Sequence, residues 1–103
     1  MKLLAVATTV ATLEAARQLA RTMVERRLAA CAEISAIESF YAWKGEVADD
    51  PEFRVVFKTT DERYPAVATA IGELHAYELP AIDAVVLERA SGAYARWIEE
   101  SCR

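Results

Sequence analysis

The chain has 103 residues, 54% of them hydrophobic, and a formal net charge of −4. This length suits one domain with one core, which we expect to span residues 1–103. The acidic balance argues against nucleic acid as a partner, and no apolar run approaches the ~18 residues that a membrane span needs.

The first part of the chain predicts a strand followed by an amphipathic helix. Residues 3–7 form a short, continuous apolar run, which is typical of a strand buried on both faces. Thr12 can then cap a helix. Apolar residues at helical spacing extend this helix over residues 13–29.

The middle of the chain predicts a long antiparallel hairpin. Its two strands, residues 31–44 and 53–60, are rich in β-branched and aromatic residues, and Lys44-Gly45 supplies a turn signal. The first strand would run about 46 Å at ~3.3 Å per residue, whereas a compact globule of this length is roughly 33 Å across. The hairpin is therefore expected to project beyond the domain that carries it.

Two features of the hairpin concern its regularity. Apolar residues change from one face to the other between Ile34 and Ile37, which predicts a bulge near Ser35-Ala36. Pro51 cannot donate to a strand ladder, so it lies either at an edge position or in a wide loop. A wide loop would shorten the hairpin.

The far end of the hairpin is apolar, carrying Phe40, Tyr41, Trp43 and Val47. A monomer would leave these side chains in water, and such a surface is either an aggregation hazard or an assembly device. We expect an assembly device, in which the hairpins join the subunits of a closed ring of three. The four residues are the predicted trimer interface.

The last part of the chain predicts a helix, a strand and a closing helix. Thr60-Asp61 can cap a helix that ends by His75. Residues 81–87 follow as a strand, and Tyr94 and Trp97 at helical spacing are expected to face the core from the closing helix. The order βαββαβ plus one helix is that of a ferredoxin-like α+β fold, an antiparallel sheet with its two main helices on one face.

Cysteine usage bears on the cellular compartment. Cys31 and Cys102 lie far apart in the sequence, and Cys102 falls near a terminus that we expect to fray. Reduced thiols are a simpler interpretation of this spacing than a disulfide. The sequence therefore predicts a cytoplasmic protein.

His75 and Cys31 are the residues with the clearest metal-binding chemistry. His75, the single histidine, is interpreted either as a metal ligand or proton-transfer group, or as a protonated helix C-cap that bonds the last carbonyls. Cys31 is interpreted either as a soft ligand for copper(I) or as a small buried apolar group. For His75 the structural interpretation is favoured, because no further ligand stands at metal-site spacing, and for Cys31 because free cysteine is among the most buried residue types.

A polar cleft between subunits is the other candidate site. We expect it to be lined by polar and aromatic side chains that follow the hairpin and the second helix. They are Lys58, Tyr77, Tyr41, Trp43, Trp97 and Glu78. The alternative is a structural ion pair with aromatic interface anchors. Catalytic patterns are thin, since only a Cys31/His75 dyad is conceivable, and we expect no enzyme.

Five short motifs, in order and in spacing, resemble the CutA divalent-cation tolerance family across nearly the whole chain. They are Leu28-Ala-Ala-Cys31, Ser39-Phe-Tyr-Ala-Trp-Lys-Gly45, Lys58-Thr-Thr60, His75-Ala-Tyr-Glu-Leu-Pro80 and Tyr94-Ala-Arg-Trp97-Ile98. The resemblance implies a ferredoxin-like fold, a homotrimer built through the hairpins and a topology similar to PII signalling proteins. It also implies a role in the response to divalent metals, copper above all, without established catalysis.

The chain departs from the family pattern at positions that bear on the metal. Copper-binding members of the family can carry a cysteine at the end of the first strand and two adjacent histidines. Here Thr8 and Leu74 stand at two of these places, and His75 remains. The resemblance therefore carries over His75, with Cys31 or Glu78, as candidate metal ligands. Two alternatives remain open, a PII-like small-molecule or anion sensor that uses Lys58 and Arg54 for negative charge, and a thiol enzyme at Cys31.

Overall fold

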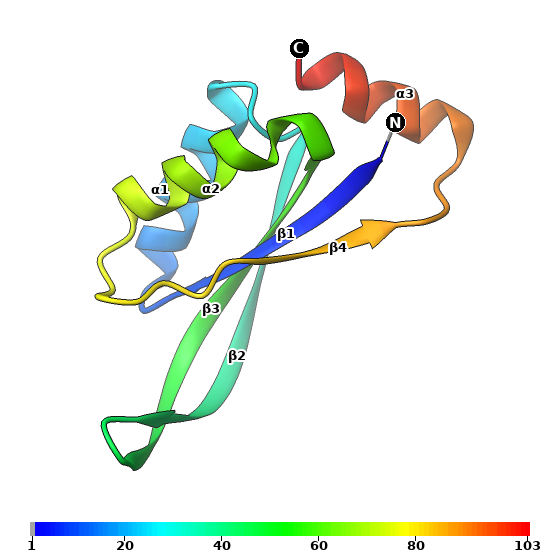
Figure 1. Ribbon diagram of the computed structural model, residues 1–103. Helices are drawn as coiled ribbons and strands as arrows, with labels where there is room; N and C mark the ends of the chain where they lie inside the picture. Colours follow the sequence, from blue (N-terminus) through cyan, green and yellow to red (C-terminus); the bar gives the residue numbers. More distant parts are fainter. Residues whose placement is uncertain (1) are drawn as a thin grey trace.

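The computed structural model describes residues 2–103 and has the predicted element order (Figure 1). The elements are β1 (Leu3–Val10), α1 (Leu13–Glu25), β2 (Cys31–Trp43), β3 (Glu46–Thr60), a 3-10 turn (Asp61–Arg63), α2 (Tyr64–Leu74), β4 (Asp83–Leu87) and α3 (Gly92–Ser101). The sheet order is β2-β3-β1-β4, and each neighbouring pair is antiparallel. This is the predicted ferredoxin-like arrangement.

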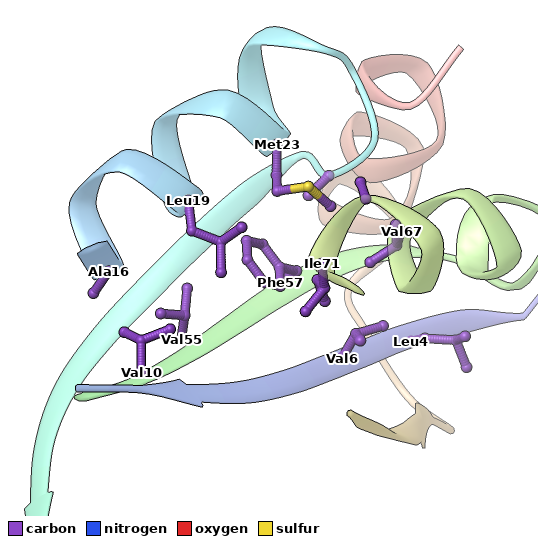
Figure 2. Close-up of a cluster of buried hydrophobic side chains, with 12 residues drawn as sticks. Leu4, Val6, Val10, Ala16, Leu19, Met23, Val55, Phe57, Val67 and Ile71 are labelled. Carbon is purple, nitrogen blue, oxygen red and sulfur yellow. The ribbon is translucent and has the colours of Figure 1, made fainter. Parts of the chain in front are cut away.

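The main core lies between the sheet and the helices α1 and α2. Val6, Val55 and Phe57 project from β1 and β3 onto Met23 of α1 and Ile71 of α2, and water reaches none of the five side chains. Figure 2 shows these residues pointing toward one another. Both helices therefore cover the same face of the sheet, as expected.

Helix α1 ends earlier than its apolar pattern predicts. Thr12 caps its start by accepting the N–H of Ala15 at 3.0 Å. At the other end Arg27 adopts φ 61°, and Leu28 N–H bonds the Met23 carbonyl, which stops the helix in a Schellman-like turn. The predicted helix ran to residue 29 because apolar residues keep a helical spacing through this turn, and spacing alone does not show where a helix ends.

Helix α3 packs across the end of the sheet and corrects two predictions. Ile98 and Cys102 pack against Leu3 in a second cluster, so Cys102 is 4% exposed and the predicted fraying there is wrong. Tyr94 and Trp97 are 37% and 45% exposed, so their predicted core position is also wrong. A ten-residue helix on the rim of a sheet buries a narrow stripe, and Ile98 fills it.

The hairpin of β2 and β3 is regular from end to end. Its register runs without interruption from Cys31 opposite Lys58 to Trp43 opposite Glu46, so the predicted bulge is absent. Ile34 and Ile37 lie on opposite faces of β2 without a bulge. The strand passes the end of β1 between them, so the face that is apolar can differ on the two sides of this point. Pro51 pairs with Glu38 beyond the end of β1, which is the predicted edge position.

The hairpin also turns in the smallest possible loop and projects far from the body. Lys44 and Gly45 have φ of 50° and 83°, as in a two-residue type I′ turn. The molecule measures 44 × 25 × 22 Å, and the long dimension follows the hairpin (Figure 1). Phe40 is 64% exposed and Val47 78% exposed near its tip, as predicted for a single chain.

Candidate functional site

The hairpin strands carry two groups of polar and aromatic side chains at different heights. The first, called here the base cluster, consists of Cys31, Glu33, Lys58, Tyr94 and Trp97, where α3 meets the start of β2. The second, called the groove, is a cavity of about 690 Å³ farther along the hairpin. Its lining residues are Thr9, Ala11, Ser39, Tyr41, Ala42, Trp43, Asp50, Pro51, Glu52, Tyr77, Glu78, Leu79 and Ala81.

In the base cluster a lysine is held between a carboxylate and an aromatic ring. Lys58 Nζ donates to Glu33 Oε1 at 3.1 Å and lies 6.0 Å from the ring centroid of Tyr94. The bond to Glu33 raises the pKa of Lys58 above its ordinary value. The Cys31 thiol lies 3.8 Å from the Tyr94 hydroxyl, and Trp97 stacks on the same ring. The ammonium is thus already paired within the chain.

In the groove two tyrosines donate to two carboxylates. The Tyr77 hydroxyl bonds Glu52 Oε2 at 2.7 Å, and the Tyr41 hydroxyl bonds Asp50 Oδ2 at 2.8 Å. Burial, followed by the bond to Glu52, raises the pKa of Tyr77 far above its ordinary value. The bond to Asp50 is the main cause that raises the pKa of Tyr41. Both phenols therefore stay protonated as donors at neutral pH.

His75 fastens the loop after α2 to strand β1. Its Nδ1 accepts the backbone N–H of Tyr77 at 3.0 Å, and its Nε2 lies 2.7 Å from the Thr9 carbonyl. A backbone N–H can only donate and a carbonyl can only accept, so the imidazole is neutral with its proton on Nε2. The predicted bond to the last helix carbonyls is wrong, because the side chain reaches β1 instead.

The candidate metal ligands Cys31, His75 and Glu78 lie in different parts of one chain. Across residues 2–103, no three His, Cys, Asp or Glu side chains are placed to share one ion. Both His75 nitrogens are engaged, and Cys31 belongs to the base cluster rather than to the groove. Thr8 is 1% exposed and is not among the residues that line the groove.

The predicted cleft residues divide between the two groups. Tyr41, Trp43, Tyr77 and Glu78 meet in the groove, whereas Lys58 and Trp97 lie with Cys31 in the base cluster. Sequence reasoning missed Asp50 and Glu52, which it assigned to the region around Pro51. The turn at Lys44-Gly45 held the signal, because the register it sets puts both carboxylates on the face of Tyr41.

The family described as CutA1 divalent ion tolerance protein matches residues 4–101. The chain belongs to this family. The divalent-cation tolerance protein CutA of Thermotoga maritima is 39% identical over 88 residues, covering 85% of this chain and 87% of that protein.

Solved CutA structures have the same fold. The structure of CutA from Synechococcus elongatus is 37% identical, with a TM-score of 0.95 over 99% of this chain and 91% of that one. The structure of the periplasmic divalent cation tolerance protein CutA from Archaeoglobus fulgidus is 32% identical, with a TM-score of 0.95 over all of both chains. Within residues 2–103, no helix has the length and apolar character needed to cross a membrane.

Proposed function

We propose that this CutA-family protein acts as a homotrimer in the response to divalent metal ions, copper above all, by binding rather than by catalysis. Its ligand, a metal ion or a small molecule, binds in a cleft between subunits. The proposal covers one domain over residues 1–103 and a cytoplasmic location, in keeping with two cysteines that are free thiols.

The observation that carries the proposal is the projecting hairpin. Tyr41 and Trp43 are 39% and 37% exposed, and Phe40 and Val47 more so, on an arm that has little of its own body to pack against. Exposed apolar surface of this kind marks an interface. A neighbouring chain would cover these side chains, and a ring of three closes without endless stacking.

The division of the cleft residues between two groups supports a site shared by two chains. One chain holds Lys58 and Trp97 at the base of the hairpin and Tyr77 and Glu78 at the groove. If one subunit's base cluster faces the next subunit's groove, all the predicted cleft residues meet. Of the candidate metal ligands, Cys31 and Glu78 would meet there in the same way, whereas His75 lies behind the groove and would have to exchange its bond to Tyr77 for one to the metal.

Equilibrium dialysis with Cu²⁺ tests the metal part of the proposal. We expect Cys31→Ala and His75→Ala to lower copper uptake by the assembled protein. Cys102→Ala removes a thiol that is buried in the core beside α3 and should leave copper uptake unchanged. Equal uptake by wild type and all three variants would show that neither Cys31 nor His75 binds copper.

The alternative of a PII-like anion sensor has less support. Lys58, one of its two candidates for binding negative charge, is already paired with Glu33, whereas Arg54, the other, is exposed. The groove itself is lined by carboxylates. Thermal-shift screening against nucleotides and small carboxylates would reveal such a sensor, because a bound ligand raises the melting temperature.

A further inference from the structure

Helix α3 has little apolar surface to hold it against the rest of the domain. It lies at the end of the sheet opposite the hairpin turn (Figure 1), and of its ten residues Ile98 alone is buried. Cys102, directly after the helix, is 4% exposed and packs with Ile98 against Leu3. This small contact does not by itself offset the entropy lost when a ten-residue segment is ordered, so further contacts must fix α3 in place.

Two arginines from other parts of the chain bond the end of α3, and together they are called here the α3 clamp. Arg63, which ends the 3-10 turn, donates from Nε to the Cys102 carbonyl at 2.6 Å. Arg27, which follows α1, donates from Nε to the Arg103 carbonyl at 2.6 Å and from Nη2 to the Glu100 carbonyl at 3.0 Å. The last carbonyls of a helix lack partners within it and carry partial negative charge, so guanidinium groups stabilise this end.

Arg27 makes its two bonds from a backbone conformation that is unfavourable for an arginine. Its φ of 61° stops α1, and glycine is the usual residue at such a position because it has no Cβ. Glycine would stop the helix without strain, but it would leave the Glu100 and Arg103 carbonyls without their guanidinium partner. The strained backbone is therefore accounted for by what the Arg27 side chain does for α3.

The position of α3 determines where two aromatic rings of the base cluster lie. The Tyr94 hydroxyl lies 3.8 Å from Cys31 Sγ, and the Tyr94 ring lies 6.0 Å from Lys58 Nζ. Trp97 stacks on Tyr94 with the ring centroids 5.7 Å apart. Both rings are partly exposed, so packing in the core does not fix them, and a movement of the whole helix would carry them away from the thiol and the ammonium.

We propose that Arg27 and Arg63 are positioning residues, which dock α3 so that Tyr94 and Trp97 stay in place beside Cys31. The inference rests on the proposed function in one respect, that the base cluster forms one half of the cleft. The docking itself is a property of a single chain, because each bond of the α3 clamp joins residues of the same chain.

Labelling of Cys102 by iodoacetamide measures whether α3 is docked. The thiol is buried 3.7 Å from the Thr59 hydroxyl, so the reagent reaches it only when α3 moves away. We expect Arg63→Gln and Arg27→Gly each to raise the labelling rate about tenfold, the value of one hydrogen bond to a charged group. Mass spectrometry of the peptides distinguishes Cys102 from Cys31.

Arg26→Gln is the matched control for the labelling experiment. It removes the same charge from the residue beside Arg27, which is exposed and is not one of the two arginines that bond the end of α3. Its labelling rate should equal that of wild type. Wild-type rates in both Arg63→Gln and Arg27→Gly would overturn the inference.

A spectroscopic signal separates a positioning role from a general effect on stability. Near-ultraviolet circular dichroism detects the stacked pair of Tyr94 and Trp97, and Trp97→Phe identifies the share of the signal that the pair contributes. Arg27→Gly relieves strain and removes two bonds to α3, so its urea midpoint should change little while the signal of the pair falls. Faster labelling of Cys102 with an unchanged signal would overturn the positioning role.

Copper uptake by the same proteins distinguishes a failure of this inference from a failure of the proposed function. Wild-type protein that takes up no copper, with the expected labelling rates in the variants, would overturn the proposed function and support the inference. Copper uptake by wild type, with equal labelling rates in all variants, would overturn the inference alone.

Discussion

Two buried threonines on neighbouring strands differ in one hydrogen bond. Thr8 is 1% exposed, and its Oγ1 has no partner within the described residues, whereas Thr59 is fully buried and donates to the Leu28 carbonyl at 2.6 Å. A buried hydroxyl without a partner is unfavourable, whereas removing a satisfied one leaves its acceptor unpaired.

Valine at these two positions should therefore have opposite effects. We expect Thr8→Val to raise the free energy of unfolding by about 1 kcal/mol, because the methyl group keeps the shape and removes the unpaired hydroxyl. Thr59→Val should lower it by about 1–2 kcal/mol. Urea denaturation measures both, and a loss of stability in Thr8→Val would mean that its hydroxyl is satisfied in solution.

Tyr77 should make the protein sensitive to alkaline pH. Burial and the bond to Glu52 raise the pKa of Tyr77 in the folded chain, whereas in the unfolded chain the phenol has an ordinary pKa of about 10. The unfolded chain alone releases this proton as the pH rises above that value, so the stabilising contribution is complete below it and is lost above it.

Tyr77→Phe removes the phenol and with it this pH-dependent contribution to stability. Its free energy of unfolding should be lower at neutral pH, for want of the bond to Glu52, and should fall less steeply than that of wild type above about pH 10. Urea midpoints measured across this range give the two slopes. Parallel slopes for the two proteins would contradict the assignment of alkaline sensitivity to Tyr77.

At the scale of elements, the sequence predicted the order of strands and helices because each has its own apolar period. It did not predict where they stop or which way they face. The end of α1 depends on the conformation of Arg27, and the outward position of Trp97 depends on how α3 meets the sheet. The first is set by a local turn and the second by tertiary packing, and an apolar period contains neither.

The candidate site was predictable to the same extent. Tyr41, Trp43, Tyr77 and Glu78 were expected together and do meet in the groove. Glu52 was missed, because a carboxylate beside Pro51 resembles a solvent-exposed turn until the strand register is known. Tyr77, on the loop that His75 fastens to β1, donates to Glu52, and these contacts join residues far apart in sequence.

The hairpin turn offers a test with an internal control. Gly45 has φ 83°, where a side chain is strained, so Gly45→Ala should lower the free energy of unfolding by about 1–2 kcal/mol. Gly72 lies within α2, and an added methyl there meets no atom within 4 Å, so Gly72→Ala should raise it by about 0.5–1 kcal/mol. Equal effects in urea denaturation would contradict the positive φ at Gly45.

At the scale of the whole molecule, the outer part of the β2–β3 hairpin (the arm) and the rest of the domain (the body) are stabilised differently. The body contains both clusters of buried side chains, whereas Phe40 and Val47 near the tip of the arm are exposed. A two-stranded ribbon by itself is marginally stable in water, and a long apolar one invites association. In the proposed trimer, neighbouring chains would therefore stabilise the arm more than the body.

Val47→Asp should separate assembly from folding. Val47 is 78% exposed in the single chain, so an aspartate there leaves the body intact but places a charge in the proposed trimer interface. Light scattering should report roughly three chains of 11.4 kDa for wild type and one for Val47→Asp, with unchanged circular dichroism.

Val24→Asp is the matched control, since Val24 is 40% exposed on α1, which packs on the part of the hairpin that lies in the core and not on its tip, and this variant should remain a trimer. Both variants replace an exposed valine with aspartate, so a difference between them depends on where the new charge lies. A trimer that survives Val47→Asp would take the tip of the arm out of the interface, and with it the reason for expecting neighbouring chains to cover the groove.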